Sequence, residues 1–522
     1  AVDKVRSIPL FYTNTKSDFI LSDNAYYLKD EKLSGKNCDQ QFNEKNAVEF
    51  MLAGYVTGND TLFDSIKQIK NAEFLIYRKK ENELKTSCYF RFLHENYYNL
   101  TEDKFFETLD HIFVNTFLRL IESTEKQGKR LVVPLSGGLD SRIIVSMLKR
   151  LGINNVICVS YGRKSSREAI ISKKVAETLG YDWLFVEYTS KEWYECYHSK
   201  EADCFRKYAG NLSSLPHMQD FLAIRELKKQ GKLPENSVFV PGHTGDMLAG
   251  GHIPAYYINN SRNYGSDIFL KDSLKKHYSL WRQPHESEFE EIFKEKVIKS
   301  VAGFEIKDNS TCASAIELFD FNERQAKYIV NSVRVYEFFG YEWRIPFWDT
   351  ELINFFLKVP IEQRVGRILY RKYARDRLFS GELSILKNID CTTDILDLRP
   401  LEKRSKYEKL LYYRRFIHSY YDETINNPIW GRYFKNPIIS RLLTKVSRYD
   451  NKSIEGYPLL KIILEYRNEK KYNLTVNGIS SLEYLADTIG ETYSSRGKMI
   501  LKPISSSTKK RLELVNMKIG KK

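Results

Sequence analysis

The chain lacks the sequence features of membrane-spanning, secreted and zinc-stabilised proteins. Among its 522 residues no stretch reaches about 18 uninterrupted apolar residues, so no transmembrane helix is expected. No signal peptide is recognisable at its start. The seven cysteines form no Cys-x-x-Cys pair, which argues against a zinc site and a disulfide framework. We therefore expect a protein of the reducing cytoplasm.

Composition excludes little else. The chain is 42% hydrophobic and 29% charged, which is ordinary for a globular protein, and its length allows two to four domains. It carries a net charge of +15, with denser basic patches at 399–415 and 509–522. We interpret this excess as solvated surface, with an anionic substrate or a peripheral membrane contact as alternatives. No nucleic-acid-binding module is recognisable, so nucleic acid is not an expected partner.

The most informative segment is 134–143, PLSGGLDSRI. An apolar run at 131–133 predicts a strand, and the apolar spacing after the glycines predicts a helix. Glycines before a helix N-terminus let backbone N–H groups approach a phosphate. The loop lacks the lysine of a Walker P-loop, and the Gly-x-Gly-x-x-Gly pattern of a dinucleotide fingerprint is absent. A carboxylate at Asp140 instead indicates Mg²⁺ between loop and phosphates, unless Asp140 and Ser141 are only helix caps.

Four segments in order resemble the asparagine synthetase family, whose members cleave ATP to AMP and pyrophosphate. They are SGGLDS at 136–141, the strand and helix at 156–180, GHTGD at 242–246, and EWRIPFWD at 342–349. The resemblance implies an α/β fold with a parallel doubly wound sheet of the PP-loop ATP pyrophosphatase (adenine nucleotide alpha hydrolase-like) type. It also implies a helical C-terminal part and a small β-rich N-terminal domain.

The same resemblance divides the chain into three parts. Residues 1–98 resemble the end of a class II glutamine amidotransferase domain, with strand-like runs at 17–22 and 73–78 but no nucleophilic cysteine at Ala1. Residues 101–395 form the ATP pyrophosphatase domain, with a helical insertion at 255–320. An amphipathic helix at 101–126 opens this domain. Residues 396–522 form a basic C-terminal extension, with helical stretches predicted at 407–421 and 459–469.

The ATP site is expected at one edge of the sheet. Asp140 and Asp246 both follow predicted strands, and open α/β sheets bind ligands at the carboxyl ends of their strands. Two carboxylates beside a phosphate chain indicate that both hold Mg²⁺. The resemblance assigns the pyrophosphate and the adenosine to separate sets of residues. The pyrophosphate set is Ser136, Gly137, Gly138, Asp140 and Ser141, and the adenosine set is Leu135, Tyr161 and Gly242.

The catalytic residues are predicted by resemblance alone. A lysine that stabilises the α-phosphate is placed at Lys387, with Lys372 as the alternative. Glu342 is expected to act as acid or base near the acceptor, and His252 stands where some relatives have a tyrosine and could relay a proton. Arg344 and Asp349 are expected to form a structural ion pair.

These residues predict an ATP-dependent amide-forming ligase that makes an acyl-adenylate. The acceptor would be a small-molecule or sugar carboxylate, with surface polysaccharide biosynthesis as one setting. Ammonia would come from solution, from a partner glutaminase or from residues upstream of Ala1. His243, Met247 and Arg142 depart from the family pattern, so free aspartate is a doubtful substrate. A lactam- or peptide-forming synthetase, a non-catalytic ATP-binding scaffold and an enzyme that adenylates RNA bases remain alternatives, and the long C-terminal half disfavours the last.

Overall fold

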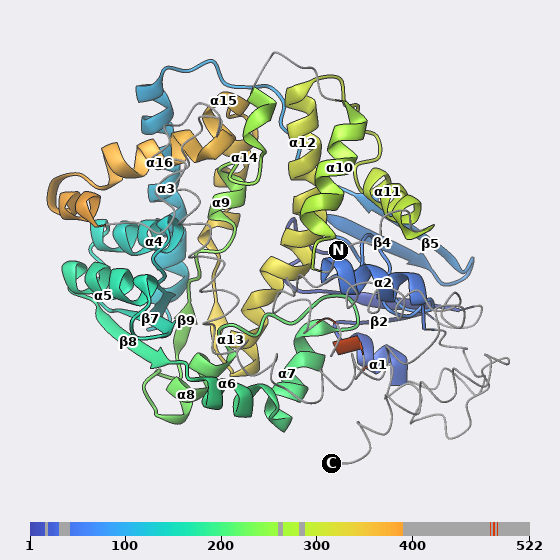
Figure 1. Ribbon diagram of the computed structural model, residues 1–522, viewed down its shortest axis with the longest axis horizontal. Helices are drawn as coiled ribbons and strands as arrows, with labels where there is room; N and C mark the ends of the chain where they lie inside the picture. Colours follow the sequence, from blue (N-terminus) through green and yellow to red (C-terminus); the bar gives the residue numbers. More distant parts are fainter. Residues whose placement is uncertain are drawn as a thin grey trace, which may run out of the picture.

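The computed structural model describes residues 1–15, 19–30, 42–258, 265–280 and 288–389, together with positions 481, 484, 485 and 488. Its centre is a five-stranded sheet in the order β10-β9-β6-β7-β8, and every pair of neighbours is parallel (Figure 1). The strands are β6 (Arg130–Pro134), β7 (Val156–Gly162), β8 (Asp182–Glu187), β9 (Ser237–Phe239) and β10 (Glu342–Trp343).

The strand order of the sheet changes direction between β6 and β9. Strands β6, β7 and β8 follow one another outward on one side, and the chain then returns to add β9 and β10 on the other. Leu131 of β6 lies opposite both Val156 of β7 and Val238 of β9. The loops after two adjacent central strands therefore open at one topological switch point, where α/β sheets bind ligands.

Strand composition explains why this sheet is central. Both β6 and β7 contain near-continuous apolar runs whose side chains are buried on both faces of the sheet. Such runs are typical of parallel strands covered by helices on two sides. The crossover helices are α4 (Leu139–Arg150), α5 (Arg167–Leu179), α6 (Ser190–Tyr197), α7 (Lys200–Gly210) and α8 (Phe221–Lys229).

Helix α3 (Glu102–Glu125) precedes the sheet and matches the predicted amphipathic helix at 101–126. Its N-cap residue is Thr101, whose side chain accepts a hydrogen bond from the Lys104 N–H over 3.4 Å. Its apolar face is buried at Phe105, Leu109 and Phe113. A capped start and one buried stripe are sufficient reasons for this sequence to be helical here.

The described residues of the N-terminal region form short strands and two helices. A three-stranded sheet has the order β2-β1-β3, and β4 pairs with β5 as a separate hairpin. Strand β4 coincides with the predicted run at 73–78, and β2 covers the end of the run at 17–22. The elements are β1 (Phe11–Asn14), β2 (Phe19–Ser22), α1 (Ala25–Asp30), α2 (Glu44–Ala53), β3 (Lys67–Gln68), β4 (Glu73–Arg78) and β5 (Glu83–Cys88).

Helical segments lie between the N-terminal strands and the parallel sheet. In Figure 1 the yellow run that includes α12 and α13 separates the blue strands from the teal helices. A single cluster of buried apolar side chains continues from the N-terminal region through these helices to the sheet. The elements after β9 are α9 (Gly245–Leu248), η2 (Ala255–Ile258), α10 (Ser266–His277), α11 (Glu288–Ser300), α12 (Asn309–Asp320), η3 (Phe321–Ile329), η4 (Val330–Val333) and α13 (Arg334–Phe338).

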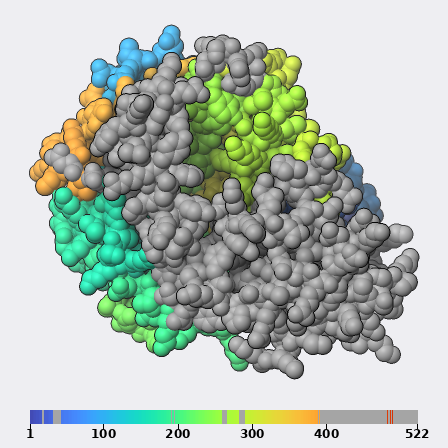
Figure 2. All heavy atoms as spheres, in the orientation of Figure 1, coloured from blue at the N-terminus to red at the C-terminus, as the bar shows by residue number. Residues whose placement is uncertain are grey.

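A last group of short helices follows β10 and packs on α3 and α4. On the face shown in Figure 2 the teal segment that includes α5 lies on the left and the lime-green segment that includes α10 lies at the upper right. The elements are η5 (Pro346–Trp348), α14 (Thr350–Leu357), α15 (Ile361–Arg364), η6 (Val365–Arg367), α16 (Ile368–Tyr373), η7 (Ala374–Leu378) and η8 (Gly381–Asn388).

Two of the described C-terminal residues, Ser481 and Tyr484, contact α2 and the end of α7. Tyr484 stacks on Phe50, with ring centroids 5.2 Å apart, and its hydroxyl accepts a hydrogen bond from the Leu212 N–H over 3.0 Å. The predicted helical stretches at 407–421 and 459–469 lie outside the described residues. Across the described ranges no helix combines the length and apolar character needed to cross a membrane.

Candidate functional site

The first predicted loop joins β6 to α4. Gly138 is the N-cap residue of α4 and makes no side-chain capping bond. The hydroxyls of Ser136 and Ser141 lie 3.2 Å apart, and the Gly138 N–H donates to Ser136 Oγ over 3.1 Å. A glycine at the N-cap has no side chain that could accept hydrogen bonds from the first N–H groups of the helix. These N–H groups can therefore bind an anion.

The second loop follows β9 and packs directly on the first. An added Cβ on Gly242 would lie 2.9 Å from the Ser141 nitrogen, and one on Gly245 would lie 2.8 Å from Asp140 Cγ. Only glycine permits such close approach. Thr244 between them has φ +74°, a conformation uncommon for a β-branched residue. The glycines of this segment are therefore a packing requirement for the two loops to meet.

Asp140 and Asp246 lie together where the loops meet. The Asp246 N–H donates to Asp140 Oδ2 over 3.1 Å, and the Tyr370 hydroxyl donates to Oδ1 over 2.8 Å. Burial and the charge of Asp246 raise the pKa of Asp140 to about 7. Burial opposes ionisation of Asp246 as well, but hydrogen bonding and the charge of His252 outweigh it and lower the pKa of that carboxyl. A cation placed between the two carboxyls would therefore be stabilised.

The donor set at this point fits Mg²⁺. Within the described residues no group of three or more His, Cys, Asp or Glu side chains is arranged to hold a metal ion. Mg²⁺ usually binds one or two carboxylates and completes its shell with phosphate oxygens and water. Each Asp140 oxygen accepts one hydrogen bond, which leaves a further acceptor position on each. Two carboxylates without a third ligand suit an ion that arrives with a nucleotide.

His252 lies beside Asp246 and links it to α12. Its Nε2 is 3.3 Å from Asp246 Oδ2, and its Nδ1 bonds to Asp320 Oδ2. Lys276 Nζ lies 2.9 Å from the same Asp320 oxygen. Burial alone would lower the pKa of His252, but Asp320 and the bond to Asp246 raise it to about 9. The structure thus brings His252 to the site as a cation held between two carboxylates.

The expected adenosine residues lie at the same edge of the sheet. Leu135 is buried directly after β6, and Gly242 touches the first loop. Tyr161, near the end of β7, donates its hydroxyl to Asp220 Oδ1 over 2.5 Å, while Tyr336 donates to the other oxygen over 2.6 Å. The Tyr161 ring is therefore held in place by a buried carboxylate, a partner that sequence reasoning missed.

Glu342 does not reach this site. Strand β10 places it opposite Val238, before the second loop begins. Its carboxylate bonds to Lys129 and lies 3.2 Å from Arg344 Nη2. The hydrogen bond from Lys129 and the charge of Arg344 lower the pKa of Glu342. Glu342 is ion-paired and lies within its strand rather than in a loop. This position does not favour the expected role as an acid or base near the acceptor.

Neither predicted lysine contacts the carboxylate pair. Lys387 is exposed in η8, and among the described contacts none joins it to Asp140 or Asp246. Lys372 forms an ion pair with Glu102 instead. The expected pair of Arg344 with Asp349 is also wrong. Asp349 lies 2.7 Å from Arg119 and caps α14, because α3 brings Arg119 against that helix start.

Several residues at the site were not predicted. Tyr370 and Arg367 come from the helices after β10, and Asp320 comes from the end of α12. His243 lies in the second loop and the His217 ring lies beside it, with ring centroids 6.3 Å apart. His217 Nδ1 and His243 Nε2 are buried and have no hydrogen-bond partner among the described residues. Burial is also the main reason that the pKa of His243 falls to about 4. The only sequence signal for His243 was its departure from the family glutamate.

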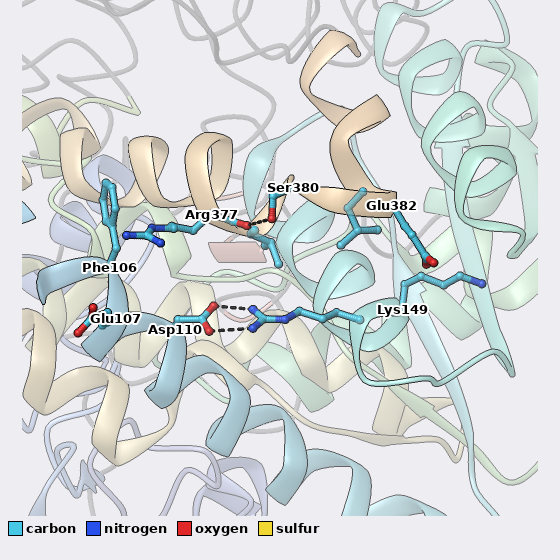
Figure 3. Close-up of a pocket in the computed structure, with 10 residues that line it drawn as sticks. Phe106, Glu107, Asp110, Lys149, Arg377, Ser380 and Glu382 are labelled. Carbon is cyan, nitrogen blue, oxygen red and sulfur yellow. Dashed lines mark hydrogen bonds and ion pairs between the residues drawn. The ribbon is translucent and has the colours of Figure 1, made fainter. Parts of the chain in front are cut away.

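A cavity of about 450 Å³ lies elsewhere, at the far end of α4. Figure 3 shows Arg377 extending toward Phe106 and Asp110 joined to a neighbouring guanidinium. That group belongs to Arg150, whose Nη2 lies 2.8 Å from Asp110 Oδ2. Arg377 also bonds to Asp103 over 2.8 Å. Because these cations already have carboxylate partners, the cavity is not the candidate nucleotide site.

Comparison with solved structures gives only weak likenesses. The NH3-dependent NAD synthetase of Campylobacter jejuni is 17% identical, and the match covers 39% of this chain and 83% of that one with a TM-score of 0.20. The U34-tRNA thiolase NcsA of Methanococcus maripaludis, which carries a [4Fe-4S] cluster, is 14% identical over 44% and 82% with the same TM-score of 0.20. Scores this low carry no weight, and the fold class rests on the parallel sheet itself.

Sequence comparison is more informative. A curated protein of Methanocaldococcus jannaschii, named as a glutamine-hydrolysing asparagine synthetase, is 23% identical over 383 residues. That match covers 73% of this chain, which spans only 57% of the relative's length. The family model for asparagine synthase matches residues 120–381, which is half of the chain and includes both loops and the Pro-Phe segment. The chain therefore belongs to the asparagine synthase family.

Proposed function

We propose that this chain is an ATP-dependent carbon–nitrogen ligase that activates a carboxylate as an acyl-adenylate and transfers ammonia or an amine to it. The observation that carries the proposal is the meeting of Asp140 and Asp246 above a glycine loop at the switch point of the sheet. Membership of the asparagine synthase family supports the same class of reaction. ATP and Mg²⁺ are the proposed substrate and ion.

In this proposal the two loops bind the phosphate chain. Backbone N–H groups of Gly137 and Gly138 and the hydroxyls of Ser136 and Ser141 would bind the pyrophosphate. The bond between the two hydroxyls, and the bond from the Gly138 N–H to Ser136 Oγ, would then be exchanged for bonds to phosphate oxygens. Mg²⁺, when bound, supplies positive charge that makes pyrophosphate a better leaving group. Asp140 and Asp246 would hold it, with His252 fixing the Asp246 carboxyl from the other side.

The proposed reaction has two steps. A carboxylate oxygen of the acceptor attacks the α-phosphorus of ATP, the bond from this phosphorus to the bridging oxygen breaks, and pyrophosphate leaves with that electron pair. The amine nitrogen then attacks the acyl carbon, the carbon–oxygen bond to AMP breaks, and the amine loses a proton. The chain's contribution is mainly to position ATP and to present charge where it develops.

We place the acceptor beside His243 of the second loop and the neighbouring His217. A buried polar atom without a partner commonly has a ligand or a water as its missing partner. Neutral imidazoles donate and accept hydrogen bonds and would suit the hydroxyl groups of a sugar acid. The same proposal includes a role in surface polysaccharide formation, with ammonia from solution or from a partner glutaminase. It also includes the division of the chain into domains at 1–98, 101–395 and 396–522. Residues 1–98 would then correspond to the end of a glutaminase-like domain.

Carboxylate-dependent formation of AMP tests this proposal. The protein would be mixed with ATP, Mg²⁺, an ammonium salt and a panel that includes aspartate, glutamate, glucuronate and galacturonate. We expect equal amounts of AMP and pyrophosphate only when a suitable carboxylate is present, and no turnover in Asp140→Ala. The control is Asp182→Ala, at a carboxylate that is 71% exposed and paired with Arg130. AMP formation that survives in Asp140→Ala would overturn the mechanism, and ATP binding without turnover would favour a scaffold.

A further inference from the structure

The segment η3 packs against the second loop and the pair of histidines beside it. It is a π-helix of nine residues, a rare form that is often found at functional sites. The Thr244 hydroxyl in the second loop donates to Gln325 Oε1 over 3.1 Å. The ring of Tyr328 lies beside His217, with ring centroids 5.5 Å apart. Side chains of η3 therefore border the place proposed for the acceptor.

Arg324 of η3 is a cation with no acceptor in the described parts of the chain. Its half-buried guanidinium has neither a hydrogen bond nor an ion pair there, and it lies over the Tyr328 ring, 6.0 Å from the centroid. Lys327 on the same segment lies instead 2.6 Å from Glu323. A guanidinium has five N–H donors, and a group partly removed from water ordinarily has acceptors. Arg324 can therefore bind an anion without losing a bond inside the described chain.

The charge of Arg324 reaches the two histidines. Burial is the main cause that lowers the pKa of His217, the charge of Asp220 opposes this, and the charge of Arg324 lowers the pKa further. Asp220 already accepts hydrogen bonds from two tyrosines. His243, whose Nε2 is buried without a partner among the described residues, lies next to His217. Donors and a fixed positive charge thus meet here, which favours an anionic ligand.

We propose that Arg324 binds a second anionic group of the acceptor, so that the substrate is a sugar acid with two negatively charged groups. This inference rests on the proposed function, in which one carboxylate of the acceptor reacts with ATP. That carboxylate would lie toward Asp140 and Asp246, and the second anionic group would lie against η3. A carboxylate and a phosphate both offer a guanidinium two oxygen acceptors, so either group fits.

Two matched pairs of sugar acids test this second group. Gluconate and glucarate differ by one carboxylate, and glucuronate and glucuronate 1-phosphate differ by one phosphate. Calorimetry would measure their affinities in the full chain, with and without Mg²⁺ and the α,β-methylene analogue of ATP, which cannot release pyrophosphate. We expect the wild type to bind the more highly charged member of at least one pair about tenfold or more tightly than the other member. The pair that shows this preference identifies the second group as carboxylate or phosphate.

Substitution of Arg324 should remove the preference. Arg324→Gln should reduce it to less than about twofold while leaving gluconate and glucuronate affinities unchanged, and Arg324→Lys should keep part of it. The control is Arg375→Gln, at an exposed arginine paired with Asp376, which should behave as wild type. Chemical denaturation would confirm that the Arg324 variants are folded, as expected for a side chain with no hydrogen bond among the described residues.

Three outcomes would overturn the assignment of Arg324. They are a wild type without preference in either pair, a preference that survives in folded Arg324→Gln, and an equal loss of affinity for all four sugar acids. If AMP still forms with a singly charged carboxylate, the ligase proposal stands without Arg324. A preference that depends on Arg324, in a protein that forms no AMP with any acceptor, would instead overturn the ligase reaction and leave an anion site at η3.

Discussion

The backbone N–H of Asp246 donates to the carboxylate of Asp140 over 3.1 Å, although 106 residues separate them in the chain. Parallel pairing of β6 with β9 brings the two loops to neighbouring positions, and glycines let them touch. This contact converts two separate sequence motifs into one site. It also makes the site sensitive to small changes in the packing of the second loop.

Gly245→Ala tests that sensitivity. The new methyl group would lie 2.8 Å from Asp140 Cγ and force the loops apart. We expect a loss of about 1–3 kcal/mol in the free energy of unfolding, as for overpacked cores, and at least tenfold weaker Mg·ATP binding. Chemical denaturation and calorimetry measure the two quantities. Gly265→Ala is the matched control, because nothing lies within 4 Å of its added Cβ. Equal behaviour of the two variants would show that close approach of the loops is not required.

Tyr370→Phe removes a hydrogen bond from Asp140 without changing the shape of the core. The hydroxyl donates to Asp140 Oδ1 over 2.8 Å and lowers the pKa of a carboxyl that burial raises. Its loss should raise that pKa further and cost about 1–3 kcal/mol of stability. Binding of Mg·ATP near neutral pH should weaken, because more Asp140 is protonated.

Tyr373→Phe is the control for Tyr370→Phe. It lies on the same helix and removes a hydroxyl that donates to Asp110 over 2.7 Å, beside the distant cavity. We expect a similar loss of stability but unchanged Mg·ATP affinity. If both variants bind Mg·ATP equally well, Tyr370 has no special part in the site.

Part of this arrangement was predictable from the sequence. Apolar runs and glycine turns located β6, β7 and the two loops, and periodicity located α3. The rule that strand ends share one edge then brought Asp140 and Asp246 together. What supports them was not predictable. Tyr370, Arg367 and Asp320 come from helical segments whose apolar spacing shows a buried face but not which loop that face covers.

Glu342 shows the limit of a motif. The segment at 342–349 was recognised correctly as family-like, yet Glu342 lies within its strand, opposite Val238, and Lys129 binds its carboxylate. Sequence spacing fixes the order of elements but not their register in the sheet. Lys387 stays a prediction, because the segment around it lacks the family pattern and its own side chain is exposed in η8.

His277 should make the protein less stable in mild acid. Burial is the main cause that lowers its pKa to about 3, whereas an unfolded histidine has a pKa near 6.5. Between these values the unfolded chain binds the extra proton, so stability from this residue is present above about pH 6.5 and is lost as pH falls. At pH 5 the loss is about 2 kcal/mol. Asp140, with a raised pKa, contributes with the opposite sign.

Comparison with His277→Phe isolates the histidine. The variant also removes the bond of His277 Nδ1 to the Tyr55 hydroxyl at 2.9 Å, which shifts stability by a similar amount at every pH. The unfolding free energy of the wild type minus that of the variant should therefore fall by about 2 kcal/mol from pH 7 to pH 5. A difference that stays constant over this range would contradict a neutral, buried His277.

The Mg²⁺ dependence of ATP affinity in Asp140→Asn, in Asp246→Asn and in the double variant is the most direct measure of the central claim. We predict that Mg²⁺ strengthens ATP binding to the wild type about tenfold or more. Each variant should lose this gain while keeping its affinity for metal-free ATP, and Glu342→Gln should behave as wild type. A double variant that retains the full Mg²⁺ effect would contradict a site in which these two carboxylates hold Mg·ATP.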